Sequence, residues 1–214
     1  MAPPHGAAGA STPRPSWAGN PPLRSAARER LIEAAMRCVV RDGLAATGIS
    51  AVAAEAGVSR PTVYRYFEDR HALVLATLLE AGRSLGEELA RRLPALREPD
   101  EMAVEAMLYV LSEVPRNELL NAMWSSTLLD AAMLADFTRE DVVAMARRAL
   151  APLVDAAGWE DDAADEAVET MLRMLLSLLV ASSPERSEGE LRRYLQRRLL
   201  PALGLGSRPK PRTR

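Results

Sequence analysis

The sequence predicts an all-α protein, and three observations support that fold class. Apolar residues make up 48% and charged residues 26% of the 214 residues, which is typical of a globular protein. The dominant residue types are Ala, Leu, Met, Glu and Arg, which are strong helix formers. Apolar positions also recur at helical spacing along almost the whole chain. We expect a three-helix domain over 23–68 and a larger helical domain over 69–203, with about nine helices and no strand.

The two ends of the chain are not expected to contribute to a core. Residues 1–22 contain six prolines among Gly, Ala and Ser, and residues 204–214 contain four basic residues and no acidic one. Such segments have too few apolar side chains to offset the entropy of ordering them. We therefore expect a disordered N-terminal arm and a disordered basic tail.

The first helix is expected from about Arg24 to Asp42, where Leu31 and Cys38 lie on one apolar face. Gly43 follows at the position where glycine commonly ends a helix. Two short helices should cover about 50–56 and 60–66. Cys38 is the single cysteine and cannot form an intramolecular disulfide. A small core residue is its expected role, and a redox sensor is the alternative.

A long helix is expected over 69–93, where Pro94 stops it, and the next begins near Pro99 and ends near Val114. Further helices should cover 117–136, 139–157, 161–182 and 188–203. Asp161 and Asp162 open the third of these, where the helix dipole favours acidic residues.

Residues 47–67 have the spacing of a helix-turn-helix. Ala53 is small where a neighbouring helix must approach closely, and Gly57 supplies the positive φ that a sharp turn needs. Val58 would fill the corner between the two helices. Ser59 suits the N-cap of the second helix, and Pro61 in its first turn removes no helical hydrogen bond.

The outer face of that second helix is expected to carry Arg60, Thr62, Tyr64, Arg65 and Tyr66. None of these residues is acidic, and all of them offer hydrogen-bond donors. Arginine and threonine in the first turn suit base edges, and tyrosine hydroxyls suit phosphates. The pattern therefore favours double-stranded DNA as the partner, against the alternative of a helical hairpin that happens to be basic.

The distribution of charge gives weaker support to a polyanionic partner for the front of the chain. Residues 1–70 carry nine arginines against six acidic residues, whereas residues 71–203 carry 14 arginines against 23 acidic residues. A net charge of −2 thus combines a basic front, an acidic body and a basic tail. The arginines of the N-terminal arm and of the basic tail could add contacts to phosphates, although we expect both segments simply to be solvated.

The same residues resemble a known family. Ala-Gly-Val-Ser-x-x-Thr-x-Tyr-x-Tyr-Phe at 56–67, followed by Arg-His-Ala-Leu at 70–73, resembles the DNA-binding domain of tetracycline-repressor-like (TetR) regulators. The resemblance covers about 24–75. It implies a homodimeric regulator whose second domain senses a small-molecule effector, most often a repressor; an activator and an interaction module without a specific operator are the alternatives.

The resemblance also implies roles for individual residues. Thr47, Tyr64 and Arg70 would hold phosphates, and Arg60, Pro61 and Arg65 would meet bases. The full set of expected DNA contacts is Thr47, Ser59, Arg60, Pro61, Thr62, Tyr64, Arg65, Tyr66 and Arg70. Gly48 departs from the family, which usually has Thr or Ser there, whereas Arg70 keeps the charge of the family's usual Lys.

Two sets of residues are expected to serve the larger domain. The run 168–180 is apolar on more than one face, so with the last helix it could form a two-fold four-helix interface, or it could be buried within one subunit. The expected interface residues are Met171, Leu175, Leu179, Leu191, Leu195 and Leu199. A Met-rich middle could hold an apolar or amphipathic effector, although such residues are usually core. The expected pocket residues are Met107, Tyr109, Met123, Trp124, Phe137 and Met145, with Tyr109 and Trp124 as polar handles.

The sequence gives no support for an enzyme. His5 lies in the N-terminal arm and His71 at the start of the long helix, so they are not expected to share a metal site. Neither G-x-x-x-x-G-K nor G-x-G-x-x-G occurs, and we expect no cofactor and no metal. No run of 18 apolar residues and no signal-peptide pattern is present, so we expect a cytoplasmic protein without a membrane partner.

Overall fold

The computed structural model describes residues 24–124, 139–180 and 186–206, and helices account for most of them. No strand occurs within these ranges, which confirms the all-α class. The described elements are α1 (Arg24–Ala46), α2 (Ile49–Ala56), α3 (Arg60–Tyr64), α4 (Arg70–Arg92), the 3-10 turn η1 (Leu93–Ala95), α5 (Pro99–Glu113), α6 (Glu118–Trp124), α8 (Glu140–Ala149), α9 (Ala151–Ala157), α10 (Asp161–Val180) and α11 (Glu188–Ala202).

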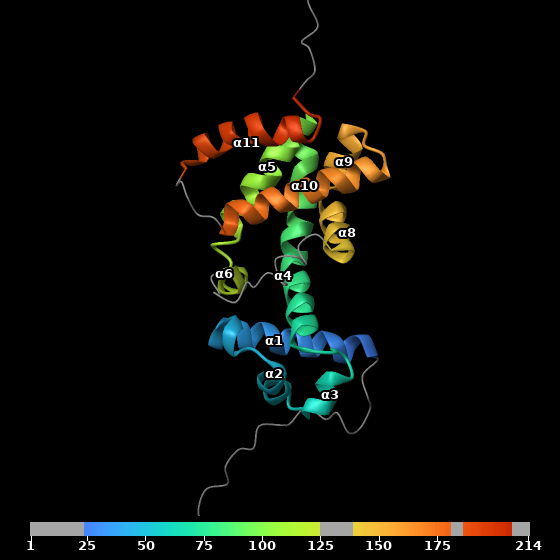
Figure 1. The fold of residues 1–214 in the computed structure, drawn as a ribbon, viewed down its shortest axis with the longest axis vertical. Helices are drawn as coiled ribbons and strands as arrows, with labels where there is room; N and C mark the ends of the chain where they lie inside the picture. The colour runs from blue at the N-terminus through green and yellow to red at the C-terminus, as the bar shows by residue number, and fades with distance from the viewer. Residues whose placement is uncertain (1–23, 125–138, 181–185, 207–214) are drawn as a thin grey trace, which may run out of the picture.

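The long helix α4 connects the two parts of the molecule (Figure 1). Its first turns stand on α1, with α2 and α3 beyond it at one end of the molecule. Its last turns lie among α5, α8, α9, α10 and α11 at the other end. The small N-terminal unit and the helical body are therefore joined by a continuous helix rather than by a flexible linker.

The N-terminal unit has its own apolar core. Leu31, Val52 and Val63 contribute from α1, α2 and α3, and Leu73 of α4 completes it. The core thus extends past the expected boundary at residue 68 into the first turns of α4. Cys38 is fully buried in this core, and burial raises the pKa of its thiol. A buried thiol of this kind is poorly suited to redox sensing and fits the expected core role.

A second apolar cluster joins the N-terminal unit to the body, and we call it the interdomain cluster. It combines residues of α1, α4 and α6 with the residue after α5. Its buried members are Val39, Leu44, Val74, Ala81, Val114, Leu120 and Met123. Because these side chains interlock across the two domains, α1 cannot move relative to α6 without repacking them.

The body has a third core, in which α11 packs against α5 and α10 against both α5 and α8. Leu205 is buried in this core and forms part of it. The expectation of a loose tail from residue 204 is therefore wrong for the described residues 204–206. Besides the burial of Leu205, its N–H donates to the carbonyl of Leu200 at 2.8 Å, which also holds the chain against the end of α11. The composition of the segment did not reveal these contacts.

One expected helix is in fact two. The sequence predicts a continuous helix over 139–157, but α8 ends at Ala149 and α9 begins at Ala151. Pro152 lies in the first turn of α9, where its missing N–H is tolerated. Inside a continuous helix the same ring would clash with the carbonyl of Arg148, so the chain turns at Leu150 instead.

Glycines 82 and 86, four residues apart on α4, bring α8 close. A Cβ added at Gly82 would lie 3.3 Å from Cε of Met145, and one added at Gly86 would lie 3.1 Å from Cβ of Ala149. The first neighbour is the end of a flexible side chain, whereas the second is fixed to the α8 backbone. A methyl group can therefore be accommodated at Gly82 by movement of Met145, whereas at Gly86 it would push against the α8 backbone.

We predict opposite effects for alanine at these two positions. Gly82→Ala should raise the free energy of unfolding by about 0.5–1 kcal/mol, because helix propensity improves and Met145 can move aside. Gly86→Ala should lower it, because the rigid contact costs about 1–3 kcal/mol. Urea unfolding of both variants at one protein concentration measures the difference. Equal stabilisation by both would show that α4 and α8 are not in close contact at Gly86.

Candidate nucleic-acid interface

The turn between α2 and α3 has the geometry that the sequence predicts. Gly57 ends α2 in the left-handed conformation, with φ 69° and ψ 32°. The N–H of Val58 donates to the carbonyl of Ala53 at 2.9 Å, which closes the turn. Ala53 is itself buried, so its small side chain permits the close approach. These contacts fix the direction in which α3 leaves the turn.

Helix α3 begins at an unusual cap. Ser59 occupies the N-cap in the extended conformation, but its hydroxyl makes no hydrogen bond to a backbone N–H. It is hydrogen-bonded to the Thr62 hydroxyl instead, at 2.9 Å between the two oxygens. Val63 and Phe67 are buried in the first core and hold the helix in place. One side of α3 is therefore anchored, and the other faces outward.

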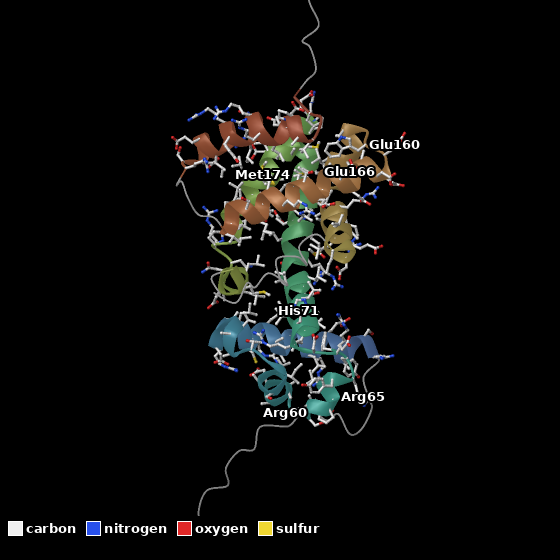
Figure 2. The ribbon with its side chains drawn as sticks, in the orientation of Figure 1. Arg60, Arg65, His71, Glu160, Glu166 and Met174 are labelled. Carbon is white, nitrogen blue, oxygen red and sulfur yellow. The ribbon has the colours of Figure 1, made fainter. Side chains whose placement is uncertain are left out.

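The outward side carries the residues that the sequence assigns to DNA. Arg60, Pro61 and Arg65 are exposed, and the Tyr64 side chain is exposed to 55% although it is aromatic. Figure 2 shows Arg60 and Arg65 at the end of the molecule furthest from α11. An exposed face that combines guanidinium groups with a tyrosine and lacks acidic residues can meet bases and phosphates together. Ser59 is also exposed, whereas Thr62 and Tyr66 are half-buried, so only part of each of these two residues is accessible to DNA.

The expectation for Thr47 is wrong in this structure. Its side chain is buried, and its hydroxyl donates to the carbonyl of Gly43 at 2.9 Å. A hydroxyl enclosed in this way cannot reach a phosphate. Gly43 has φ 80° and interrupts the helical conformation near the end of α1, which leaves carbonyls without their usual helical partners. Thr47 satisfies one of them.

Arg70 holds the same turn from the start of α4. Its Nε donates to the carbonyl of Thr47 at 2.9 Å, and its Nη2 donates to the carbonyl of Leu44 at 2.7 Å. The side chain is half-buried. These two hydrogen bonds connect α4 to the end of α1 and to the turn between α1 and α2. A role in positioning the turn was not expected, because the family resemblance implied a phosphate contact for Arg70.

Gly48, the departure from the family pattern, is the N-cap residue of α2. It has φ −141°, an extended conformation open to any residue, and it provides no side-chain cap. An added Cβ would find only Cδ of Arg70, at 4.0 Å. The position has room for the serine or threonine that is usual there, so the missing hydroxyl is a property of the sequence and is not required by packing.

An ion-pair network fixes α2 against α1. The Glu55 carboxylate accepts from Nε of Arg37 and from Nη1 of Arg41, both at 2.7 Å. These hydrogen bonds favour the charged form and lower the pKa of Glu55. The two arginines are about half exposed, so water weakens the pairing. Glu55 was not expected to have this role, because nothing in its spacing pointed to partners 14 and 18 residues earlier.

A second candidate site is an apolar cavity of about 150 Å³ in the body. It lies between α4, α5, α8 and α10, and Leu120 of α6 also lines it. Met107 and Met145 line it as expected. Tyr109 and Met123 do not: Tyr109 lies under the guanidinium of Arg92, 4.6 Å from it, and Met123 is buried in the interdomain cluster. The Trp124 side chain and Phe137 lie outside the described part.

Of the six residues expected at a subunit interface, the structure rules out two. Leu195 and Leu199 are fully buried within one protomer, so the expectation for them is wrong. They face α5, which the sequence pattern of α11 alone could not reveal. Met171, Leu175 and Leu179 of α10 line the cavity, and Leu191 is half-buried.

Other chemistries find no support in the described residues. None of their His, Cys, Asp and Glu side chains gather into a group that could hold a metal ion. No helix within the same ranges has the length and apolar character needed to span a bilayer.

The fold and the exposed face of α3 define a helix-turn-helix transcriptional regulator, and comparison with known proteins agrees. A family model described as bacterial regulatory proteins, tetR family, matches residues 31–77. An uncharacterized HTH-type transcriptional regulator of Mycobacterium tuberculosis (strain H37Rv) is 30% identical over 176 residues, which cover 82% of this chain and 84% of that protein. The chain therefore belongs to the tetR family of bacterial regulatory proteins.

Solved structures share the fold. RolR in complex with resorcinol has a TM-score of 0.63 at 22% identity, over 88% of this chain and 96% of that one. The TetR family repressor AlkX from Dietzia, implicated in biodegradation of n-alkanes, has a TM-score of 0.58 at 21% identity, over 83% of this chain and 95% of that one. At such low identities the likeness shows the architecture alone.

The Glu55 network predicts a pH dependence of stability. The pKa of Glu55 is lower in the folded protein, so its contribution is present above the ordinary glutamate value of about 4.3 and is lost as the pH falls through the folded value. Glu55→Gln should lower the free energy of unfolding at pH 7 by up to about 1 kcal/mol. The difference in the free energy of unfolding between Glu55→Gln and the unmodified protein should disappear toward pH 3.

Denaturant unfolding between pH 3 and pH 7 measures this gap. Glu33→Gln, at an exposed glutamate on α1, is the matched control and should change stability by less than about 0.5 kcal/mol. A gap for Glu55→Gln that is the same at pH 3 and pH 7 would contradict the ionic origin.

Proposed function

We propose that this protein is a homodimeric repressor that binds a near-palindromic operator through α3 and leaves it when a small apolar molecule enters the body. The observation that carries the DNA-binding part is the acid-free, exposed face of α3, in which Tyr64 is left in solvent. An aromatic side chain held out of a core by a well-packed helix suits a partner that will cover it. Its place of action is the cytoplasm, where that DNA lies.

On the operator, α3 enters the major groove. Arg60 at the start of the helix is suited to a bidentate contact with guanine, and Arg65 and Tyr64 reach the flanking backbone or bases. Arg70 positions the turn that carries α2 and can add its positive charge near a phosphate. In a two-fold dimer the recognition helices would lie about 34 Å apart, one DNA turn.

The dimer would form on the outer face of α10. Leu176 and Val180 are four residues apart and belong to none of the apolar cores. Val180 is 48% exposed and Leu176 is half-buried. Met174, labelled on the same helix in Figure 2, is partly buried and packs against the body core. Because a half-buried leucine and an exposed valine at helical spacing gain stability when they are covered, a second copy of α10 is the proposed partner.

The cavity can influence α3 through the interdomain cluster. Val114 and Leu120 line the cavity and also belong to that cluster. They meet Leu44 of α1 there, and the carbonyl of Leu44 accepts the hydrogen bond from Arg70. A molecule that displaces Leu120 would therefore shift the packing of α1 and the turn that orients α3. A ligand that fits only one packing would shift the population toward it.

A fluorescence titration with the promoter upstream of the protein's own gene tests DNA recognition. Arg60→Ala should weaken binding by about 1–3 kcal/mol and relax specificity at one base position. Tyr64→Phe should also weaken it while leaving the melting temperature nearly unchanged. Arg83→Ala is the control, because Arg83 is exposed on α4 and forms ion pairs with the neighbouring Glu80 and Glu87 of the same helix.

Two results would overturn the assignment. Equal affinity for duplexes of any sequence, with the same salt dependence for each of them, would indicate an interaction module without a specific operator. A collapse of the melting temperature in Tyr64→Phe, with normal binding by the folded fraction, would place Tyr64 in the core.

The subunit interface has its own test. Leu176→Arg should convert the dimer to a monomer in sedimentation equilibrium, because it places a charge in an apolar contact. Val40→Arg is the matched control: Val40 is also an exposed apolar residue, at 40%, but lies on α1. It should leave the dimer intact. A Leu176→Arg protein that remains dimeric would place the interface elsewhere.

A further inference from the structure

The walls of the body cavity consist of hydrocarbon and thioether groups. All of its described wall residues are Leu, Val, Met, Ala or Gly. Most belong to α4, α5, α8 and α10, whose interior N–H and carbonyl groups are engaged in helical hydrogen bonds. Among the described residues, no wall side chain therefore offers a hydroxyl, amide or charged group to a molecule inside.

This composition selects against polar ligands. A hydroxyl that leaves water for such a cavity loses its hydrogen bonds and gains none, and a carboxylate loses far more. The expected polar handle at Tyr109 is absent from the wall, because that ring lies against Arg92 on another side of α5. An amphipathic ligand would therefore have its polar end unsatisfied by the described wall.

The size of the cavity limits the ligand further. An apolar cavity of about 150 Å³ is large enough to bind benzene. Met107 and Met145 can change rotamer and enlarge it slightly, since methionine is the most adaptable apolar side chain. Little room remains between Gly82 and Met145, because a Cβ added at Gly82 would lie 3.3 Å from Cε of Met145. The space suits one small ring and not a drug-sized molecule.

We propose that the cavity binds an uncharged hydrocarbon without hydrogen-bonding groups, of the size of benzene or toluene, and that this chemical class is the effector. The second half of the statement rests on the proposed repressor function, whereas binding in the cavity does not. Recognition comes from shape and from the transfer of apolar surface out of water. Selectivity comes from the described wall, whose side chains offer no partner to a polar group.

Calorimetric titration of the full-length protein with benzene, toluene, phenol, resorcinol and benzoate tests the ligand class. Benzene and toluene should bind with one site per protomer and raise the melting temperature. Phenol should bind at least about tenfold more weakly than benzene, because one hydroxyl remains unsatisfied. Resorcinol should be weaker again, and benzoate should not bind. Resorcinol or benzoate binding more tightly than toluene would overturn the proposal, as would no binding of any hydrocarbon, which would leave the cavity as a packing defect.

Variants locate the bound hydrocarbon. Ala146→Leu adds carbon atoms from the wall into the cavity and should abolish toluene binding. Ala144→Leu, the same change at a half-buried residue of the same helix that is absent from the wall, should leave it unchanged. If Ala146→Leu does not fold, Met145→Gln serves instead, because its amide should weaken toluene at least about tenfold and narrow the preference over phenol. Toluene affinity unchanged in a folded cavity variant would place the site elsewhere.

A measurement of operator release distinguishes binding of the hydrocarbon in the cavity from its role as the effector. Saturating toluene should weaken operator binding at least about fivefold in a fluorescence titration. Toluene that binds in the cavity without loosening the operator would uphold the site and overturn the effector role. A protein that binds no operator would refute the repressor function, and the calorimetry would still decide the cavity.

Discussion

The apolar contact between α1 and α6 is the constraint on which the relation between the two domains depends. Val39 and Leu44 meet Leu120 there, and Val114 joins them from the end of α5. The Leu44 carbonyl also accepts from Arg70, so the same residue is held by packing on one side and by a guanidinium on the other. Close-packed groups change between discrete arrangements rather than deforming smoothly. The proposed coupling therefore requires that the orientation of the helix-turn-helix follows the arrangement that this cluster adopts.

The parts of the molecule that depend on local chemistry could be predicted from the sequence. Gly57 is required at one turn because only a left-handed residue completes it, and the structure shows φ 69° at that position. The exposed face of α3 followed from helical spacing, since Val63 and Phe67 define its buried side. The burial of Cys38 followed from the same period in α1.

The parts that depend on which helices meet could not be predicted in the same way. Leu195 and Leu199 lie on an apolar stripe that suits a partner subunit as well as α5, and the stripe alone does not distinguish them. Thr47 is the type of residue that binds phosphates, but the carbonyl left by Gly43 uses its hydroxyl. The cavity arises where α4, α5, α8 and α10 fail to fill a common space. The glycines Gly82 and Gly86 mark where α8 approaches α4 closely, but they do not show that the four helices leave a space beside that contact.

The coupling between the cavity and α3 is the central claim, and Val39→Ala tests it most directly. Val39 belongs to the interdomain cluster but lines neither the cavity nor the exposed face of α3. The measurement is the ratio of operator dissociation constants with and without saturating toluene, for the unmodified protein and the variant. The account predicts that the ratio falls severalfold in the variant while toluene affinity and ligand-free operator affinity stay within about threefold. An unchanged ratio would contradict it.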